Sequence, residues 1–197
     1  MIGDEFPTVL AAAQTGAEWA VAALYRDLHP AVLAFMTARV GGDAEDLAAD
    51  VFITVAQRLA SFEGDERSLR SWVFTVAYRK VGESWRQSSR RRTEPAPLSE
   101  LVSHLPCGDV EVEALEGLST ADALAAIARL GSPQAEVVLL RVVADLSVED
   151  VAVIVGKRPG AVRSLQHRAL IRLAREFVPE PRNVEGRPGH DLVDDPS

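Results

Sequence analysis

Residues 147–173 read SVEDVAVIVGKRPGAVRSLQHRALIRL, and this stretch decides the fold of the C-terminal part of the chain. Its pattern predicts a short amphipathic helix, a tight turn and a second helix rich in Arg and His. Ala152, Gly156 and Val162 are spaced as a helix-turn-helix requires, with a small residue at the crossing, a glycine in the turn and an aliphatic anchor. The segment therefore predicts a DNA-binding element.

The charge pattern supports this interpretation and adds a second basic surface. Residues 157–175 contain six Lys/Arg and no Asp/Glu, and residues 67–92 contain eight Lys/Arg and one Glu, although the net charge is −8. Between them, residues 93–120 contain six acidic residues and no Lys/Arg, and residues 1–66 are also acidic. Two basic blocks separated by an acidic segment indicate two DNA-contacting surfaces on separate domains.

Composition limits the class of protein. The chain has 197 residues, of which 47% are hydrophobic and only 6% aromatic, and this bias favours helices. No apolar run approaches the roughly 20 residues of a membrane span, and the acidic start MIGDEF does not resemble a signal peptide. Cys107 is the single cysteine, which excludes a disulfide framework and a cysteine zinc site. We expect a cytoplasmic protein without membrane insertion, metal or other cofactor.

Periodicity predicts an all-α fold. Helical spacing begins at residues 17–39, where Pro30 predicts a kink or a break. A second helix is expected from Asp43 to Leu59, and Ser68 is expected to cap a third, basic helix that ends near residue 92. Helical pattern resumes at residues 119–130, and the next helix is expected to have Ser132 as its N-cap and Pro133 as its first residue.

Two small helical domains joined by a flexible acidic linker follow from this pattern. Prolines and glycines without periodicity predict the linker, and the Pro/Gly-rich acidic end predicts a disordered tail. The expected segments are an N-terminal extension (1–16), a first domain (17–92), the linker (93–117), a helix-turn-helix domain (118–178) and the tail (179–197).

Two blocks of the sequence, taken together, resemble a known family. The first begins ALYRDLHPAVLAFMTARVG and continues to VAYRKVGESWR, and the second runs from ALAAIARL to HRALIRL. In this order and spacing they resemble the σ2 and σ4 domains of the extracytoplasmic-function (ECF) group of σ70-type RNA polymerase sigma factors. The resemblance implies a subunit that binds core RNA polymerase, recognises the −10 and −35 promoter elements and starts transcription initiation.

For the helix after Asp43, the resemblance implies docking on the clamp of the polymerase β′ subunit. The positions concerned are Asp46, Ala49, Asp50 and Thr54. Charge complementarity at such a surface mainly sets register and association rate. Many relatives have Gln where this chain has Ala49, so one interfacial hydrogen bond is absent.

For the loop and basic helix that follow, the resemblance implies contacts with the −10 element. A melted strand requires a pocket for a flipped base and cations along its phosphates. The residues concerned are Ser61, Phe62, Glu63, Gly64, Arg79, Lys80, Arg86 and Arg90. Arg79 and Glu83 stand where many relatives have Asn and Asp, so the preferred −10 sequence is not carried over.

The second helix of the helix-turn-helix is expected to enter the major groove of the −35 element. Arg163, Ser164, His167 and Arg168 are expected to face the bases, because Arg recognises guanine in bidentate fashion, while Lys157 and Arg158 contact phosphates. On the opposite face the expected core positions are Val162, Leu165, Leu170 and Leu173.

The partners implied are core RNA polymerase (through its β′ clamp and β flap) and promoter DNA. An anti-sigma factor, common in the family, is a further partner that the resemblance allows. The alternative is a stand-alone helix-turn-helix regulator that does not bind polymerase, which gives no reason for the acidic face at residues 44–59. An enzyme using Asp46, Asp50 or His29 is disfavoured, because no nucleotide loop, ligand cluster or nucleophile–base pair has useful spacing.

Overall fold

The computed structural model describes residues 1–91 and 120–177, and every regular element within these ranges is helical. The all-α prediction is confirmed. The α-helices are α1 (Phe6–Gln14), α2 (Glu18–Val40), α3 (Ala44–Leu59), α4 (Glu66–Arg91), α5 (Thr120–Ala128), α6 (Ser132–Val138), α7 (Val148–Val155) and α8 (Pro159–Phe177). Two 3₁₀ turns (Gly3–Glu5 and Gly41–Asp43) and one π-helical turn, η3 (Leu139–Val143), complete the described elements.

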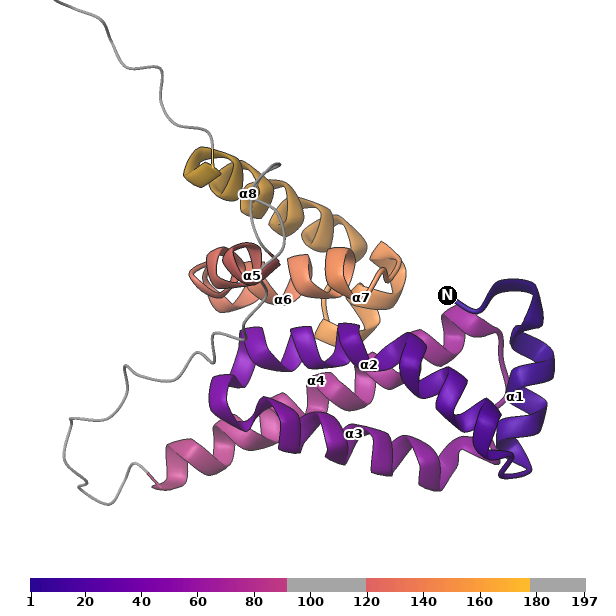
Figure 1. Cartoon of the computed structure of the whole chain (residues 1–197). Coiled ribbons are helices and arrows are strands. Elements are labelled where there is room, and N and C mark those ends of the chain that lie inside the picture. The colour runs from indigo at the N-terminus through magenta and orange to yellow at the C-terminus, as the bar shows by residue number, and fades with distance from the viewer. Residues whose placement is uncertain (92–119, 178–197) are drawn as a thin grey trace, which may run out of the picture.

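The helices form two groups that pack against each other (Figure 1). In the first group α2 packs on α1, α3 and α4, and in the second α8 packs on α6 and α7. The groups meet where α2 contacts α5 and η3, and where α4 contacts α7. Helix α8 lies on the outer side of the second group, away from α2 (Figure 1).

Residues 1–16, predicted as an extension, contain a helix that packs on the first group. Phe6, Val9 and Leu10 of α1 are buried. The Met1 amino group lies 2.6 Å from Asp27 Oδ1, and the Gly3 N–H donates to Glu66 Oε2 at 3.0 Å. The N-terminal segment is therefore held against α2 and α4.

Helix boundaries differ from the predicted ones at three places. Helix α2 continues through Pro30 rather than breaking there. Asp65, not Ser68, caps α4, because its carboxylate accepts the Ser68 N–H. Gly131, not Ser132, is the N-cap of α6, so this helix begins one residue earlier than expected. The predicted linker (93–117) and disordered tail (179–197) lie outside the described residues.

The buried apolar side chains of the two groups form one contiguous cluster. Phe35 and Phe74 meet edge to face near its centre, with ring centroids 5.9 Å apart. The buried guanidinium of Arg70 pairs with Asp27 at 2.8 Å. None of the helices in the described ranges has the length and apolar character that a bilayer crossing requires.

Candidate nucleic-acid interface

The helix-turn-helix at residues 147–173 forms as its sequence pattern predicts. Ser147 caps α7 by accepting the Asp150 N–H at 3.0 Å. Gly156 ends α7 with φ of 65°, a left-handed conformation in which a side chain is strained. The Lys157 N–H then donates to the Ala152 carbonyl at 2.9 Å, which closes the turn before α8. Backbone geometry therefore fixes where α8 begins.

Helix α8 presents one face to the core and leaves the other free. Val162 and Ala169 are fully buried, and Leu165 and Leu173 are partly buried. Leu170 was expected in this set but is 44% exposed, so that prediction is wrong. At about 3.6 residues per turn, position 170 lies roughly 100° around the helix from position 169, beyond the edge of the packed stripe.

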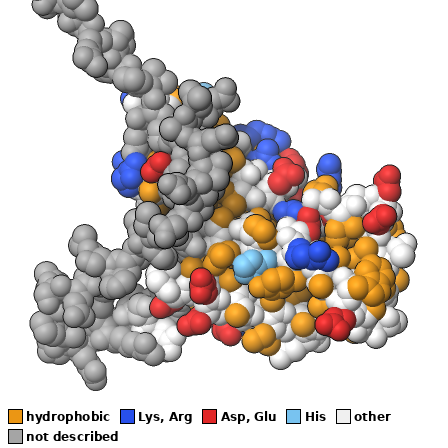
Figure 2. Space-filling model, viewed as in Figure 1, with side chains coloured by type: hydrophobic (Ala, Val, Ile, Leu, Met, Phe, Trp, Pro, Cys, Tyr) orange, Lys and Arg blue, Asp and Glu red, His pale blue; other side chains and the backbone are white. Residues whose placement is uncertain are grey.

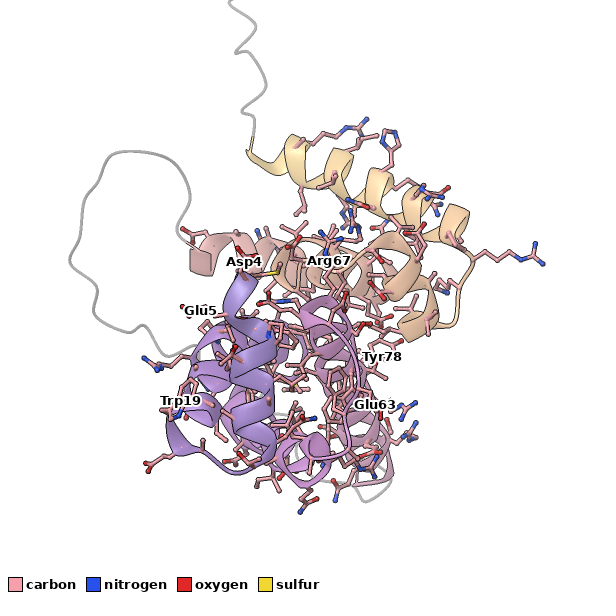
Figure 3. All side chains as sticks on the ribbon, turned by 90° about the vertical axis from the view of Figure 1, so that its right-hand side faces the viewer. Asp4, Glu5, Trp19, Glu63, Arg67 and Tyr78 are labelled. Carbon is pink, nitrogen blue, oxygen red and sulfur yellow. The ribbon has the colours of Figure 1, made fainter. Side chains whose placement is uncertain are left out.

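All six residues predicted for the −35 element are exposed on or next to this helix. Arg163 forms an exposed ion pair with Glu149 at 3.0 Å, and Arg168 Nε donates to the Ser164 carbonyl at 3.2 Å. Nitrogen-tipped side chains of α8 project away from the rest of the molecule (Figure 3). The six residues are Lys157, Arg158, Arg163, Ser164, His167 and Arg168. The geometry brings them together on one surface.

The loop before α4 has a defined conformation that depends on two residues. Asp65 Oδ1 accepts the Ser68 N–H at 2.8 Å and the Ser68 hydroxyl at 2.5 Å, and these hydrogen bonds lower the pKa of the Asp65 carboxyl. Gly64 has φ of 154°, and a Cβ there would lie 2.9 Å from the Ser68 Cβ and 3.0 Å from the Phe62 ring. A larger residue therefore does not fit at position 64.

The residues predicted for the −10 element fall into two classes. Ser61, Glu63, Arg79 and Arg86 are exposed, as is Gly64. Phe62 is half-buried and stacks on Trp72 of α4, with ring centroids 5.4 Å apart and planes at 17°. This stacking anchors the loop on α4 through the Phe62 ring. The side chain of Arg90 lies outside the part of the chain that the structure describes.

Lys80 connects the predicted −10 surface to the predicted docking surface. Its Nζ lies 3.4 Å from Asp50 Oδ2 on α3. Asp46, Ala49 and Asp50 are exposed along α3, and the hydroxyl of Thr54 donates to the Asp50 carbonyl at 2.9 Å. The two surfaces therefore share an ion pair on adjacent helices.

Sequence reasoning missed an apolar groove beside the docking surface. This α2–α3 groove has a volume of about 560 Å³ and is lined by Tyr25, Phe52 and Ile53, among other side chains. Tyr25 and Ile53 are 44% and 55% exposed. Figure 2 shows hydrophobic side chains gathered over this face, with acidic side chains along its lower margin. The signal available in the sequence was two large apolar residues, Tyr25 and Ile53, that lie off the apolar stripes of their helices.

Sequence reasoning also missed Gln14. From α1, its amide donates to the Leu59 carbonyl at 3.1 Å and to the Phe62 carbonyl at 2.7 Å. It therefore provides a hydrogen-bond donor for the last carbonyl of α3 and positions the loop at residues 61–65. A partly buried glutamine at the end of a helix gives no sign of this role in the sequence.

Comparison with known proteins identifies the family. Residues 24–91 match the model of Sigma-70 region 2, and residues 120–173 match that of Sigma-70 region 4. The chain is also 31% identical over 184 residues to the ECF RNA polymerase sigma factor SigD of Mycobacterium tuberculosis, covering 90% of this chain and 86% of SigD. This chain belongs to the ECF group of the σ70 family.

Two further comparisons extend this assignment. The sigma factor is 36% identical over 165 residues to the ECF RNA polymerase sigma factor BldN of Streptomyces coelicolor, covering 83% of this chain but only 62% of BldN. Its fold resembles the sigma factor RpoE of Bartonella quintana, solved in complex with the anti-sigma factor NepR. The TM-score is 0.58 at 25% identity, over 77% of this chain and 92% of RpoE.

In this sigma factor, the region 2 match ends at the last described residue of α4, and the region 4 match begins at the first residue of α5. The two groups of helices are thus the region 2 and region 4 domains. Helix α1 precedes the matched part of region 2, although it packs on that domain.

Proposed function

We propose that this sigma factor binds core RNA polymerase, recognises the −10 and −35 elements and starts transcription initiation. The observation that supports this most is the pairing of surfaces on adjacent helices. Helix α3 exposes Asp46 and Asp50, while α4 exposes Arg79 and Arg86. A protein that only binds DNA has no use for an acidic face next to a basic one.

In this proposal α3 docks on the β′ clamp. Asp46, Ala49, Asp50 and Thr54 form the polar part of the surface, and the α2–α3 groove next to it supplies apolar area. Buried apolar area with a charged rim is typical of specific protein interfaces. The region 4 domain would contact the β flap.

The region 4 domain then reads the −35 element with α8. Arg163, Ser164, His167 and Arg168 face the bases, and Lys157 and Arg158 contact phosphates near the beginning of the helix. One bidentate Arg–guanine pair contributes about 1–3 kcal/mol of discrimination. Because Arg163 is already paired with Glu149, it must exchange that exposed partner for a base.

The region 2 domain acts on the −10 element. The loop containing Ser61, Phe62, Glu63 and Gly64 would accept a base that leaves the duplex. Further along α4, the displaced strand would follow a basic path made by Arg79, Lys80, Arg86 and Arg90. Unpairing a base costs a few kcal/mol, which stacking and phosphate contacts must offset.

This role requires no chemistry by the sigma factor itself, and it places the protein in the cytoplasm with the polymerase. An anti-sigma factor is a further proposed partner, because the similar RpoE structure contains one. The exposed apolar side chains of the α2–α3 groove are a surface that such a partner can cover.

The experiment is capture of core polymerase by the tagged full-length chain, followed by run-off transcription from a promoter library. The substitution pair Asp46→Lys and Asp50→Lys should abolish capture and transcription. The matched control, Asp4→Lys with Glu5→Lys, makes the same charge change at exposed positions outside α3 (labelled in Figure 3) and should retain both. Specific DNA binding without polymerase capture by the wild-type chain would instead support the stand-alone regulator.

A further inference from the structure

A buried polar network connects the region 2 and region 4 domains. Arg39, near the end of α2, pairs with Glu136 of α6 at 2.8 Å, and their side chains are only 6% and 12% exposed. The second carboxylate oxygen of Glu136 accepts the Tyr78 hydroxyl of α4 at 3.2 Å. Ser132 donates to Glu136 at 2.8 Å and accepts from Arg39 at 3.0 Å. We call these four residues the Glu136 network.

The network extends onto α4 through Trp85. The guanidinium of Arg39 lies 4.3 Å from the centre of the Trp85 ring, and Trp85 Nε1 donates to the Arg39 carbonyl at 3.3 Å. A second link, between the Ser71 hydroxyl and Asp150 Oδ1 at 3.2 Å, joins α4 to α7. Helix α4, which carries the proposed −10 contacts, is therefore tied directly to region 4.

The chemistry of this contact favours a specific but separable interface. A buried ion pair adds little net stability, because desolvation offsets the attraction, yet losing one partner leaves a costly unpaired charge. Burial lowers the pKa of Arg39, although Glu136 and Tyr78 oppose that shift, and its Nε has no hydrogen-bond partner. The network thus selects one arrangement of the domains without making it permanent.

In this arrangement the sigma factor cannot contact the −10 and −35 elements of one promoter at the same time. Helix α7 packs on α4 and on α8, and packed helix axes lie about 8–10 Å apart, so α4 and α8 approach to about 20 Å. The −10 and −35 elements are named for positions about 25 base pairs apart, or about 85 Å of duplex. The domains must separate before one promoter is contacted at both places.

We propose that the Glu136 network is a latch that holds the free sigma factor closed, and that it opens before both promoter elements are bound. Arg39 supplies the charge from region 2, Glu136 is its partner in region 4, and Tyr78 connects the pair to the −10 helix. The closed state is independent of the proposed function. Its consequence for promoter reading rests on that function.

The test is a distance measurement between spin labels in the full-length chain without polymerase or DNA. Labels are placed at Thr8→Cys on α1 and Ala174→Cys on α8, both exposed, with Cys107→Ser to remove the native thiol. The otherwise unsubstituted chain should give one short distance. Glu136→Gln, which leaves the Arg39 charge unpaired, should shift the population toward longer distances by about tenfold or more. Tyr78→Phe, which removes one hydrogen bond, should cause a smaller shift of about two- to tenfold.

Glu149→Gln is the matched control. It makes the same substitution in the same domain, but its Arg163 partner also lies in region 4, so the distance should not change. Unchanged distances in Glu136→Gln and Tyr78→Phe, with helical content retained, would overturn the latch. A broad distribution of long label-to-label distances in the protein with an intact Glu136 network would also overturn it. Neither result affects polymerase capture, which tests the proposed function separately.

Discussion

The two basic helices, α4 and α8, differ in how much of their charge is already engaged within the protein. On α8, Arg163 pairs with one exposed acidic side chain, and Arg168 donates to the helix's own backbone. On α4, Arg70 is buried against Asp27, and Lys80 pairs with Asp50 of the docking helix. The basic side chains of α8 are thus held only by weak exposed contacts, whereas those of α4 form ion pairs with α2 and α3.

This difference indicates two kinds of DNA contact. Helix α8 is held by a capped turn and a packed stripe, so it can enter a major groove with only the exposed Arg163–Glu149 pair to break. Helix α4 shares an ion pair with the predicted docking surface, and Tyr78 and Ser71 link it to region 4. We therefore expect contacts with the −10 element to depend on polymerase binding and domain opening, and contacts with the −35 element to depend mainly on α8 itself.

The strongest test of this contrast removes the base-reading charge of α8. Arg163→Ala with Arg168→Ala should weaken binding of the holoenzyme to the −35 element by about 100-fold, since each bidentate pair contributes about 1–3 kcal/mol. Arg172→Ala with Arg175→Ala makes the same charge change at exposed positions near the end of the helix; it is the control and should have a much smaller effect. Binding is measured by fluorescence anisotropy at several salt concentrations. Equal losses in both proteins would mean that α8 acts only through net charge.

The next test asks whether the loop before α4 must keep its conformation. Gly64→Ala places a Cβ against Ser68 and Phe62 and should destabilise the protein by about 1–3 kcal/mol, as well as slow promoter melting. Gly160→Ala, where a Cβ would meet nothing within 4 Å, is the control and should be neutral. Chemical denaturation gives the stability, and permanganate reactivity of unpaired thymines gives the melting. If Gly64→Ala is as stable as Gly160→Ala, the loop is not constrained as described.

A smaller effect is expected at Gln14, which holds the same loop from α1. Gln14→Ala leaves two backbone carbonyls without their donor and should lower the free energy of unfolding by about 1–2 kcal/mol. Thr8→Ala changes an exposed residue of the same helix and should leave stability unchanged. Hydrogen exchange at residues 59–65 should increase only in the first variant. No change there would show that α1 does not position the loop.

Local signals in the sequence predicted the parts of this molecule that local interactions determine. The alanine, glycine and valine of the helix-turn-helix act on neighbours within one or two turns, and α7 and α8 form where the pattern predicts. The core of α8 was predicted at Val162, Leu165 and Leu173, but Leu170 was wrongly included and the buried Ala169 was missed, since helical spacing locates a stripe better than its edges. The cap of α4 was misplaced because Asp65 and Ser68 are both good capping residues, and only the path of the loop decides between them.

Contacts between distant segments gave no such signal. Arg39 and Glu136 are 97 positions apart, and each appears in the sequence as an ordinary charged residue on an amphipathic helix. Gln14 and the loop it holds are likewise separated by more than 40 positions. The −10, −35 and docking residues came from the family resemblance together with the charge pattern, and their roles stay predictions. What the structure adds is that Lys80 and Asp50, expected to serve different partners, are paired.

The smallest expected effect is a pH dependence of the closed state that arises from Tyr78 of α4. Burial raises the pKa of the Tyr78 hydroxyl above its ordinary value of 10.0, and Glu136 adds to the shift while Arg39 opposes it. Because the closed state holds this proton more tightly, its stabilisation is complete below about pH 10 and is lost as pH rises through the raised pKa. As pH rises above about 10, the spin-label distance should lengthen. In Tyr78→Phe the distances should vary less over this range, since the titrating hydroxyl is gone. Identical pH profiles in the two proteins would show that Tyr78 does not contribute to closure and would leave the Ser71–Asp150 hydrogen bond as the direct polar link between α4 and region 4.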